Sequence, residues 1–133
     1  MTVAREMLDA APVPTEFGAE AAAAAIDACM VTEQACTSCA NSCLAEDDVA
    51  EMTRCIALCD DCADVCAATL RALSRPFGME RLATERLLSA CVQACANCAE
   101  ECHRHAPHHR HCAICEEACR ACLDACAALL KSD

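Results

Sequence analysis

The chain has 133 residues, a formal net charge of −11 and 17 cysteines. This length is typical of one domain, so we expect residues 1–133 to form a single unit. The acidic balance argues against partners such as nucleic acid or an anionic membrane surface, because both require clustered Lys and Arg. Gly (2) and Pro (4) are few while Ala, Leu and Glu are plentiful, which favours helices throughout.

The order of elements predicts one short helix followed by four long ones. Residues 2–11 are expected to form the short amphipathic helix, with Thr2 as its candidate cap and Pro12 and Pro14 after its end. The long helices are expected over residues 15–45, 49–74, 79–104 and 107–131. Four long helices with short connections are typical of an all-α, up-down-up-down four-helix bundle. We therefore expect residues 1–14 to be an N-terminal helix with a proline linker, and residues 15–131 to be the bundle.

Two connections carry residues that predict where the next helix begins. Asp47 or Asp48 can cap the helix that starts near residue 49. Pro107 is suited to the first position of the last long helix, where its missing N–H costs no hydrogen bond.

The cysteines recur three or four positions apart, which is the spacing of one face of a helix. They fall into four runs: Cys29, Cys36, Cys39 and Cys43; Cys55, Cys59, Cys62 and Cys66; Cys91, Cys95, Cys98 and Cys102; and Cys112, Cys115, Cys119, Cys122 and Cys126. At 100° per residue each run is a narrow stripe that can face the bundle axis. Thr32 is a gap in the first stripe, and we assign it no ligand role. The four stripes together predict a tube of sulfur inside the bundle.

The two ends of this tube are expected to differ. Apolar residues continue the stripes at one end and form a plug: Ala25, Ile26, Leu70, Leu73, Leu87, Leu88, Leu129 and Leu130. The other end carries the Glu46–Asp48 turn and the histidine-rich stretch 103–111. Because helical phase places His105, His108 and His111 on or near the stripes, we expect these three to form a mouth that receives metal ions. Met52 flanks the mouth and is a further candidate ligand, whereas His103 and His109 are expected to point elsewhere.

Seventeen thiols in helical register favour binding of soft metal ions. Iron–sulfur clusters use a different, loop-rich spacing. Four Zn²⁺ on sixteen thiolates would leave a buried charge of about −8, which is very costly. One Cu(I) per thiolate leaves the filled tube neutral. The stripes therefore predict a store of many Cu(I) ions, about one per cysteine, and the absence of any catalytic motif predicts that the protein is not an enzyme.

The cysteines are expected to be reduced. Side chains at i+3 and i+4 are about 5–6 Å apart at Cβ, too far for an undistorted disulfide. No signal peptide or membrane span is apparent in the sequence. We therefore expect a cytoplasmic protein with free thiols.

The C-x3-C-x2-C-x3-C runs at Cys55–Cys66 and Cys91–Cys102, the run at Cys112–Cys126 and the histidine-rich connection resemble the bacterial copper storage proteins of the Csp family. The resemblance covers about residues 18–131. It implies a homotetramer of four-helix bundles that hold Cu(I) in their cores, with histidines at the open end. Without a leader, the chain is similar to the cytosolic branch of the family.

Two other functions remain open from the sequence alone. The first is a metallothionein-like buffer for zinc or mixed soft metals, and the second is a thiol redox sensor. The partners we expect are copper ions and copper chaperones.

Overall fold

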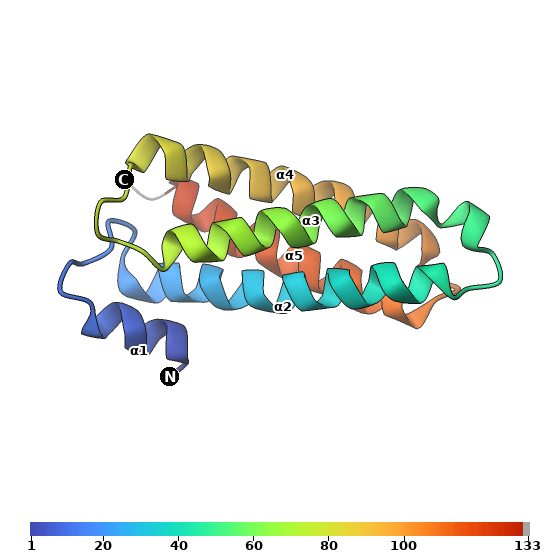
Figure 1. Cartoon of the computed structure of the whole chain (residues 1–133), viewed down its shortest axis with the longest axis horizontal. Coiled ribbons are helices and arrows are strands. Elements are labelled where there is room, and N and C mark those ends of the chain that lie inside the picture. Colours follow the sequence, from blue (N-terminus) through green and yellow to red (C-terminus); the bar gives the residue numbers. More distant parts are fainter. Residues whose placement is uncertain (132–133) are drawn as a thin grey trace.

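The computed structural model describes residues 1–131, which form a bundle of four long antiparallel helices with a short helix packed on its side (Figure 1). The elements are α1 (Val3–Ala10), α2 (Ala19–Leu44), the 3₁₀ turn η1 (Val49–Glu51), α3 (Thr53–Leu73), α4 (Arg81–His105) and α5 (Arg110–Lys131). The long helices pack in a closed ring, α2 on α3, α3 on α4, α4 on α5 and α5 on α2. The predicted all-α, up-down-up-down bundle is therefore confirmed.

Local hydrogen bonds define where the first two helices begin. The Thr2 hydroxyl accepts from the Arg5 backbone N–H at 3.4 Å and caps α1, as predicted. The second helix begins at Ala19 rather than at residue 15, because Thr15 makes a turn with Phe17 and Gly18 instead. Gly18 has φ +82°, a left-handed conformation that favours glycine, and it lies immediately before α2.

The predicted starts of the later helices are also wrong by two to four residues. The 3₁₀ turn precedes α3, and neither aspartate caps it, since Asp48 binds a histidine instead. Pro107 does not begin α5, because the backbone N–H groups of His108 and His109 both bond back to the His105 carbonyl. Residues 106–109 thus close the end of α4, and α5 begins only at Arg110.

The apolar plug lies where it was predicted, at the end that holds the start of α2 and the connection from α3 to α4 (Figure 1). Ala25, Leu73, Leu88 and Leu129 have no exposed surface, and Ile26 is almost fully buried. Leu70 and Leu87 are half-buried. Leu130 differs from the prediction, because its side chain is exposed.

Truncation of a plug leucine tests how much this end contributes to stability. Leu88→Ala should lower the free energy of unfolding of the metal-free protein by about 2–5 kcal/mol, because it leaves a cavity in a closed layer. Leu82→Ala on the same helix removes an exposed side chain and should change it by less than about 0.5 kcal/mol. If urea unfolding showed that both variants lose the same free energy of unfolding, the plug would not be packed as described.

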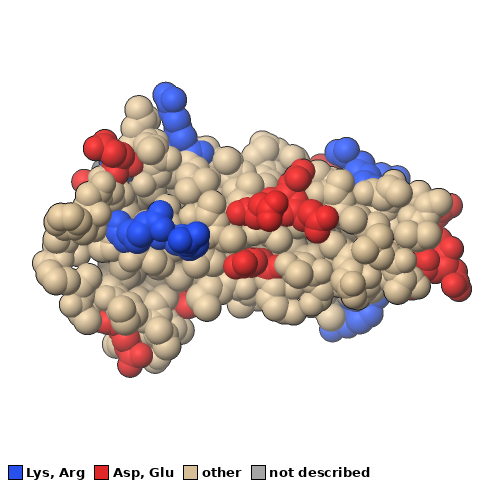
Figure 2. Space-filling view, viewed as in Figure 1, with Lys and Arg blue, Asp and Glu red and all other residues tan. Residues whose placement is uncertain are grey.

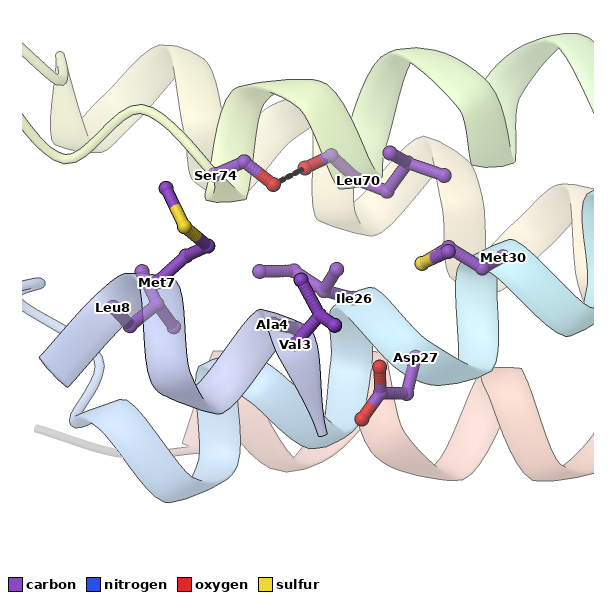
Figure 3. Close-up of a pocket in the computed structure, with 9 residues that line it drawn as sticks. All are labelled: Val3, Ala4, Met7, Leu8, Ile26, Asp27, Met30, Leu70 and Ser74. Atoms are coloured by element: carbon purple, nitrogen blue, oxygen red, sulfur yellow. Dashed lines mark hydrogen bonds between the residues drawn. The ribbon is translucent and has the colours of Figure 1, made fainter. Parts of the chain in front are cut away.

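The short helix α1 lies along α2 and leaves an apolar groove beside it (Figure 3). The groove has a volume of about 430 Å³ and is lined by side chains of α1, α2 and the end of α3. Val3, Met7 and Met30 remain largely exposed there. None of the helices in residues 1–131 has the length and apolar character needed to cross a membrane.

Candidate metal site

All seventeen cysteines are free thiols, and each has at most 1% of its surface exposed. The four stripes therefore face the bundle axis, as the helical phase predicted. The thiols form most of the core, which is otherwise built mainly from small or aliphatic side chains. Such a core excludes water from every sulfur while keeping the sulfurs beside one another.

Neighbouring helices bring the sulfurs into direct contact. The Sγ atoms of Cys29 and Cys122 are 3.6 Å apart, and so are those of Cys36 and Cys115. Contacts within one helix are slightly longer, as in the 4.0 Å between the sulfurs of Cys62 and Cys66. A metal ion between two or three such sulfurs could therefore join residues of different helices.

Groups of three or four ligand atoms lie within 4.8 Å of one another along the tube. These groups include Cys29, Cys66, Cys91 and Cys122; Cys62, Cys66 and Cys95; Cys36, Cys98, Cys115 and Cys119; Cys39, Cys59, Cys102 and Cys115; and Cys39, Cys43, His111 and Cys112. The groups overlap, since Cys39, Cys66 and Cys115 each belong to two of them. A structural zinc site is a closed set of four ligands. Shared sulfurs instead favour bridging thiolates and metal ions distributed along the whole core.

Burial favours the protonated form of the thiols, and the pKa of many of them is raised, whereas hydrogen bonds between thiols lower the pKa of others. Burial raises the pKa of the Cys43 thiol, and nearby sulfurs add to the effect. The pKa of Cys29 is raised as well, first by its hydrogen bond with Cys122 and also by burial. Cys39 is different, because hydrogen bonds from Cys102 and Cys112 lower its pKa. Cys39 therefore has more thiolate character than these two, and it lies at the mouth.

The mouth brings an imidazole against this thiol. His111 Nδ1 lies 3.3 Å from the sulfur of Cys39 and 3.6 Å from that of Cys112. Its Nε2 donates to a Glu46 carboxylate oxygen at 2.8 Å. Because a carboxylate can only accept, Nε2 carries the proton and Nδ1 is directed at the sulfurs. Burial acts to lower the pKa of His111, but the bonds to Cys39 and Glu46 outweigh it and raise it.

A second histidine lies beside the first, although the sequence predicted that it points elsewhere. The His109 ring stacks on His111 with centroids 5.6 Å apart. Its two nitrogens contact Glu46 at 2.7 Å and Asp48 at 3.1 Å, and the bond with Asp48 raises the pKa of His109. Acidic side chains are visible at this end of the molecule in Figure 2, at the right. They give the mouth carboxylates that attract cations.

The structure does not bring the other two predicted histidines onto the sulfurs in the same way. His105 is mostly buried, but its Nε2 bonds to the buried carboxylate of Glu101 at 2.8 Å. That carboxylate also binds Arg104 at 3.1 Å. His108 is exposed in the turn before α5. Its predicted position on the stripe was wrong, because a helical phase was extended through residues that are not helical.

Met52 and Thr32 both lie in the buried interior. Met52 has no exposed surface and directly precedes α3, three residues before Cys55. Thr32 is equally buried, and its hydroxyl donates to the Ala118 carbonyl at 3.1 Å. Thr32 thus occupies the position in the first stripe where a cysteine is missing, and its hydroxyl proton is used in a hydrogen bond to the backbone.

Comparison with known proteins gives one family for this arrangement. Residues 18–131 match the family model of the copper storage proteins. An uncharacterised cysteine-rich protein of Bacillus subtilis is 33% identical over 108 residues, which cover 80% of this chain and 93% of that protein.

Solved structures agree with the family match. The copper storage protein of Streptomyces lividans, loaded with 10 copper equivalents, is 45% identical, with a TM-score of 0.94 over 96% of this chain and 98% of that one. A structure of the cytosolic copper storage protein of the same organism with five coppers is 49% identical, with a TM-score of 0.84 over 86% of this chain and 95% of that one.

Proposed function

This chain belongs to the copper storage protein family, and from that premise we propose that it stores or sequesters Cu(I) as thiolate complexes inside the bundle. The observation that carries the proposal is the continuous, fully buried column of seventeen thiols with shared sulfurs. Soft thiolates select Cu(I), and one monovalent ion per thiolate neutralises the core along its whole length. The role is binding capacity rather than catalysis.

We assign ligand roles to all seventeen cysteines and to His111. The geometry around His111 supports this choice, since a ring nitrogen, Cys39 and Cys112 converge on one point at the mouth. Imidazole and thiolate are both competent ligands for copper. His105 and Met52 are proposed to line the same end, where they flank the route into the core.

The location, assembly and partners that we propose rest on the same family. We propose a cytoplasmic location on the similarity to the cytosolic protein of S. lividans. We also propose a single domain that assembles as a homotetramer and receives copper from chaperones. The exposed apolar groove beside α1, with Val3, Met7 and Met30, is consistent with contacts between subunits.

Anaerobic titration of the reduced protein tests the function directly. Cu(I) should bind to a limit near one ion per cysteine. A zinc buffer would instead saturate at about four ions, each bound by four thiolates. It would also retain Zn²⁺ when Cu(I) is added as a competitor. Thiol counting on freshly isolated protein is the control, because a redox sensor with defined disulfides would show fewer than 17 free thiols. Saturation at about four ions with preference for Zn²⁺ would overturn the copper assignment.

The His111→Ala variant tests the mouth. We expect it to load Cu(I) more slowly, by about tenfold, while its final capacity falls by no more than about one ion, since imidazole binds at the surface and thiolates fill the core. His103→Ala is the matched control, because His103 is 70% exposed and pairs with Glu116 outside the core. The measurement is stopped-flow transfer from a Cu(I)–chelator complex. Equal rates for the two variants would place uptake elsewhere.

A further inference from the structure

Glu46 supplies the carboxylate on which the two stacked histidines of the mouth meet. One of its oxygens, Oε2, lies 2.8 Å from Nε2 of His111 and 2.7 Å from Nδ1 of His109. The two rings are 5.6 Å apart at their centroids, with an angle of 30° between their planes. His109 has a second carboxylate, Asp48, 3.1 Å from its other nitrogen, whereas His111 has the sulfurs on its other side. The orientation of the His111 ring therefore depends on Glu46 more than that of His109 does.

The backbone on both sides of Glu46 is hydrogen-bonded. The Glu46 N–H donates to the Cys43 carbonyl at 3.3 Å, directly after the end of α2. The Glu46 carbonyl accepts from the Val49 N–H at 3.2 Å, in the turn that leads to η1. The side chain is 30% exposed, so the protein shields most of it from water. The carboxylate thus projects from an anchored turn, which continues a helix that itself carries four of the thiols.

The bond to Glu46 determines which atom of the His111 ring faces the sulfurs. Because a carboxylate only accepts, Nε2 carries the proton and Nδ1 keeps its lone pair. Nδ1 lies 3.3 Å from the sulfur of Cys39 and 3.6 Å from that of Cys112. The χ2 torsion of a histidine has a broad, roughly two-fold profile, so a ring without this bond can turn over. A ring turned over in this way would place a carbon, Cδ2, against the sulfurs, and carbon cannot bind the metal ion.

We propose that Glu46 is a positioning residue, which holds the His111 ring so that Nδ1 stays on the sulfurs of Cys39 and Cys112 and captures Cu(I) there. This inference rests on the proposed copper storage. In metal sites the second nitrogen of a ligating histidine commonly donates to a carboxylate, which fixes the tautomer and the ring orientation. Loss of such a partner lowers metal affinity or activity by about 10–100-fold. Glu46 itself binds no copper in this role, because its oxygen is used by the two imidazoles.

A double-mutant cycle tests whether Glu46 acts through His111. Glu46→Ala should slow the transfer of Cu(I) from a chelator complex by about tenfold, while the final number of bound ions stays within about one of the wild type, because no thiolate is removed. Glu46→Ala combined with His111→Ala should load no more slowly than His111→Ala alone. If Glu46→Ala slowed the His111→Ala protein by a further factor of about ten, the carboxylate would act independently of the ring, and the proposal would be overturned.

Two further variants separate the position of the carboxylate from its charge. Asp47→Ala is the matched control, since Asp47 is the next residue of the same turn and its side chain is exposed. It removes the same charge and should load within about twofold of the wild-type rate, because solvent screens exposed charges. Glu46→Gln removes the charge but keeps an oxygen that accepts from Nε2, so it should load at least about threefold faster than Glu46→Ala. Equal rates for the two Glu46 variants, or an Asp47→Ala variant as slow as Glu46→Ala, would assign the effect to charge and overturn positioning.

Heteronuclear NMR of the nitrogen-labelled, metal-free protein gives a readout that does not depend on copper. At mildly alkaline pH the Nε2–H proton of His111 should be visible in the wild type and in Glu46→Gln, because the bond slows its exchange with water. In Glu46→Ala it should be lost, while the Nε2–H signal of His105, which bonds to Glu101 at 2.8 Å, remains and shows that the mouth is folded. Persistence of the His111 signal in Glu46→Ala would overturn the positioning role. A wild-type protein that binds no more than about four ions would instead overturn copper storage itself.

Discussion

Full loading with Cu(I) is expected to raise the midpoint of thermal unfolding by about 30 °C. The cysteines proposed as ligands come from all four helices, and the unfolded chain does not hold them together. Each site filled at 100 times its dissociation constant adds about 2.7 kcal/mol to stability, so three such sites already add about 8 kcal/mol. For a domain of this size about 1 kcal/mol corresponds to about 4 °C. Scanning calorimetry of the metal-free and loaded protein under anaerobic conditions measures the shift.

Removal of the copper with a strong Cu(I) chelator is the control, and the midpoint should return to that of the metal-free protein. A shift of less than about 5 °C at full loading would mean that the ions are bound at the surface, for example by the mouth histidines, since surface sites do not hold the four helices together. The Leu88→Ala variant sharpens the test. Its metal-free form should unfold at a lower temperature, while its loaded form should recover most of the loss.

The core could be predicted from the sequence because helical phase alone decides which side chains face the axis. Within the straight part of each helix, cysteines at 4-3-4 spacing stay within a narrow arc, and a bundle has one interior. Every cysteine is accordingly buried. The same argument placed Leu73, Leu88 and Leu129 at the closed end. Among the residues predicted for the plug it failed for Leu130, which lies near the end of α5 and is exposed.

The mouth could not be predicted in the same way, since its residues lie where the helices end. His108 and His109 belong to a turn that hydrogen-bonds back to His105, and a phase of 100° per residue does not apply there. The position of His109 depends on Glu46 and Asp48, which are more than sixty residues away in the sequence. A pattern of apolar residues contains no signal for such a pairing of charges.

Glu101 shows a related limit. Acidic side chains are seldom fully buried unless they are paired, yet this carboxylate is 5% exposed and pairs with Arg54, Arg104 and His105. Its burial follows from its partners rather than from its own polarity, because a carboxylate can be buried when it is paired. The basic residues Arg104 and His105, three and four positions later in the last turn of α4, are a signal in the sequence for this pairing.

Copper loading is also expected to release about one proton per ion. Burial raises the pKa of the Cys43 thiol, and hydrogen bonding with burial raises that of Cys29, so these thiols hold their protons near pH 7. Cu(I) binds the thiolate and displaces the proton. Calorimetric titration in two buffers of different ionisation enthalpy measures the number released. The ratio should average somewhat below one, because hydrogen bonds between thiols lower the pKa of some of them, such as Cys39 at the mouth and Cys91 in the interior.

The sign of the pH dependence follows from this competition. Below the raised pKa of the thiols each ion must displace a proton, so the apparent dissociation constant for Cu(I) should increase about tenfold for each unit by which the pH falls. The dependence should vanish above that pKa, where the thiolates are already formed. Zn²⁺ bound by four thiols would release up to about four protons per ion and show a correspondingly steeper dependence. A ratio near zero at all stages would mean that the bound ions are not held by buried thiols. A ratio near one would mean that each monovalent ion replaces one proton, which leaves the filled core neutral.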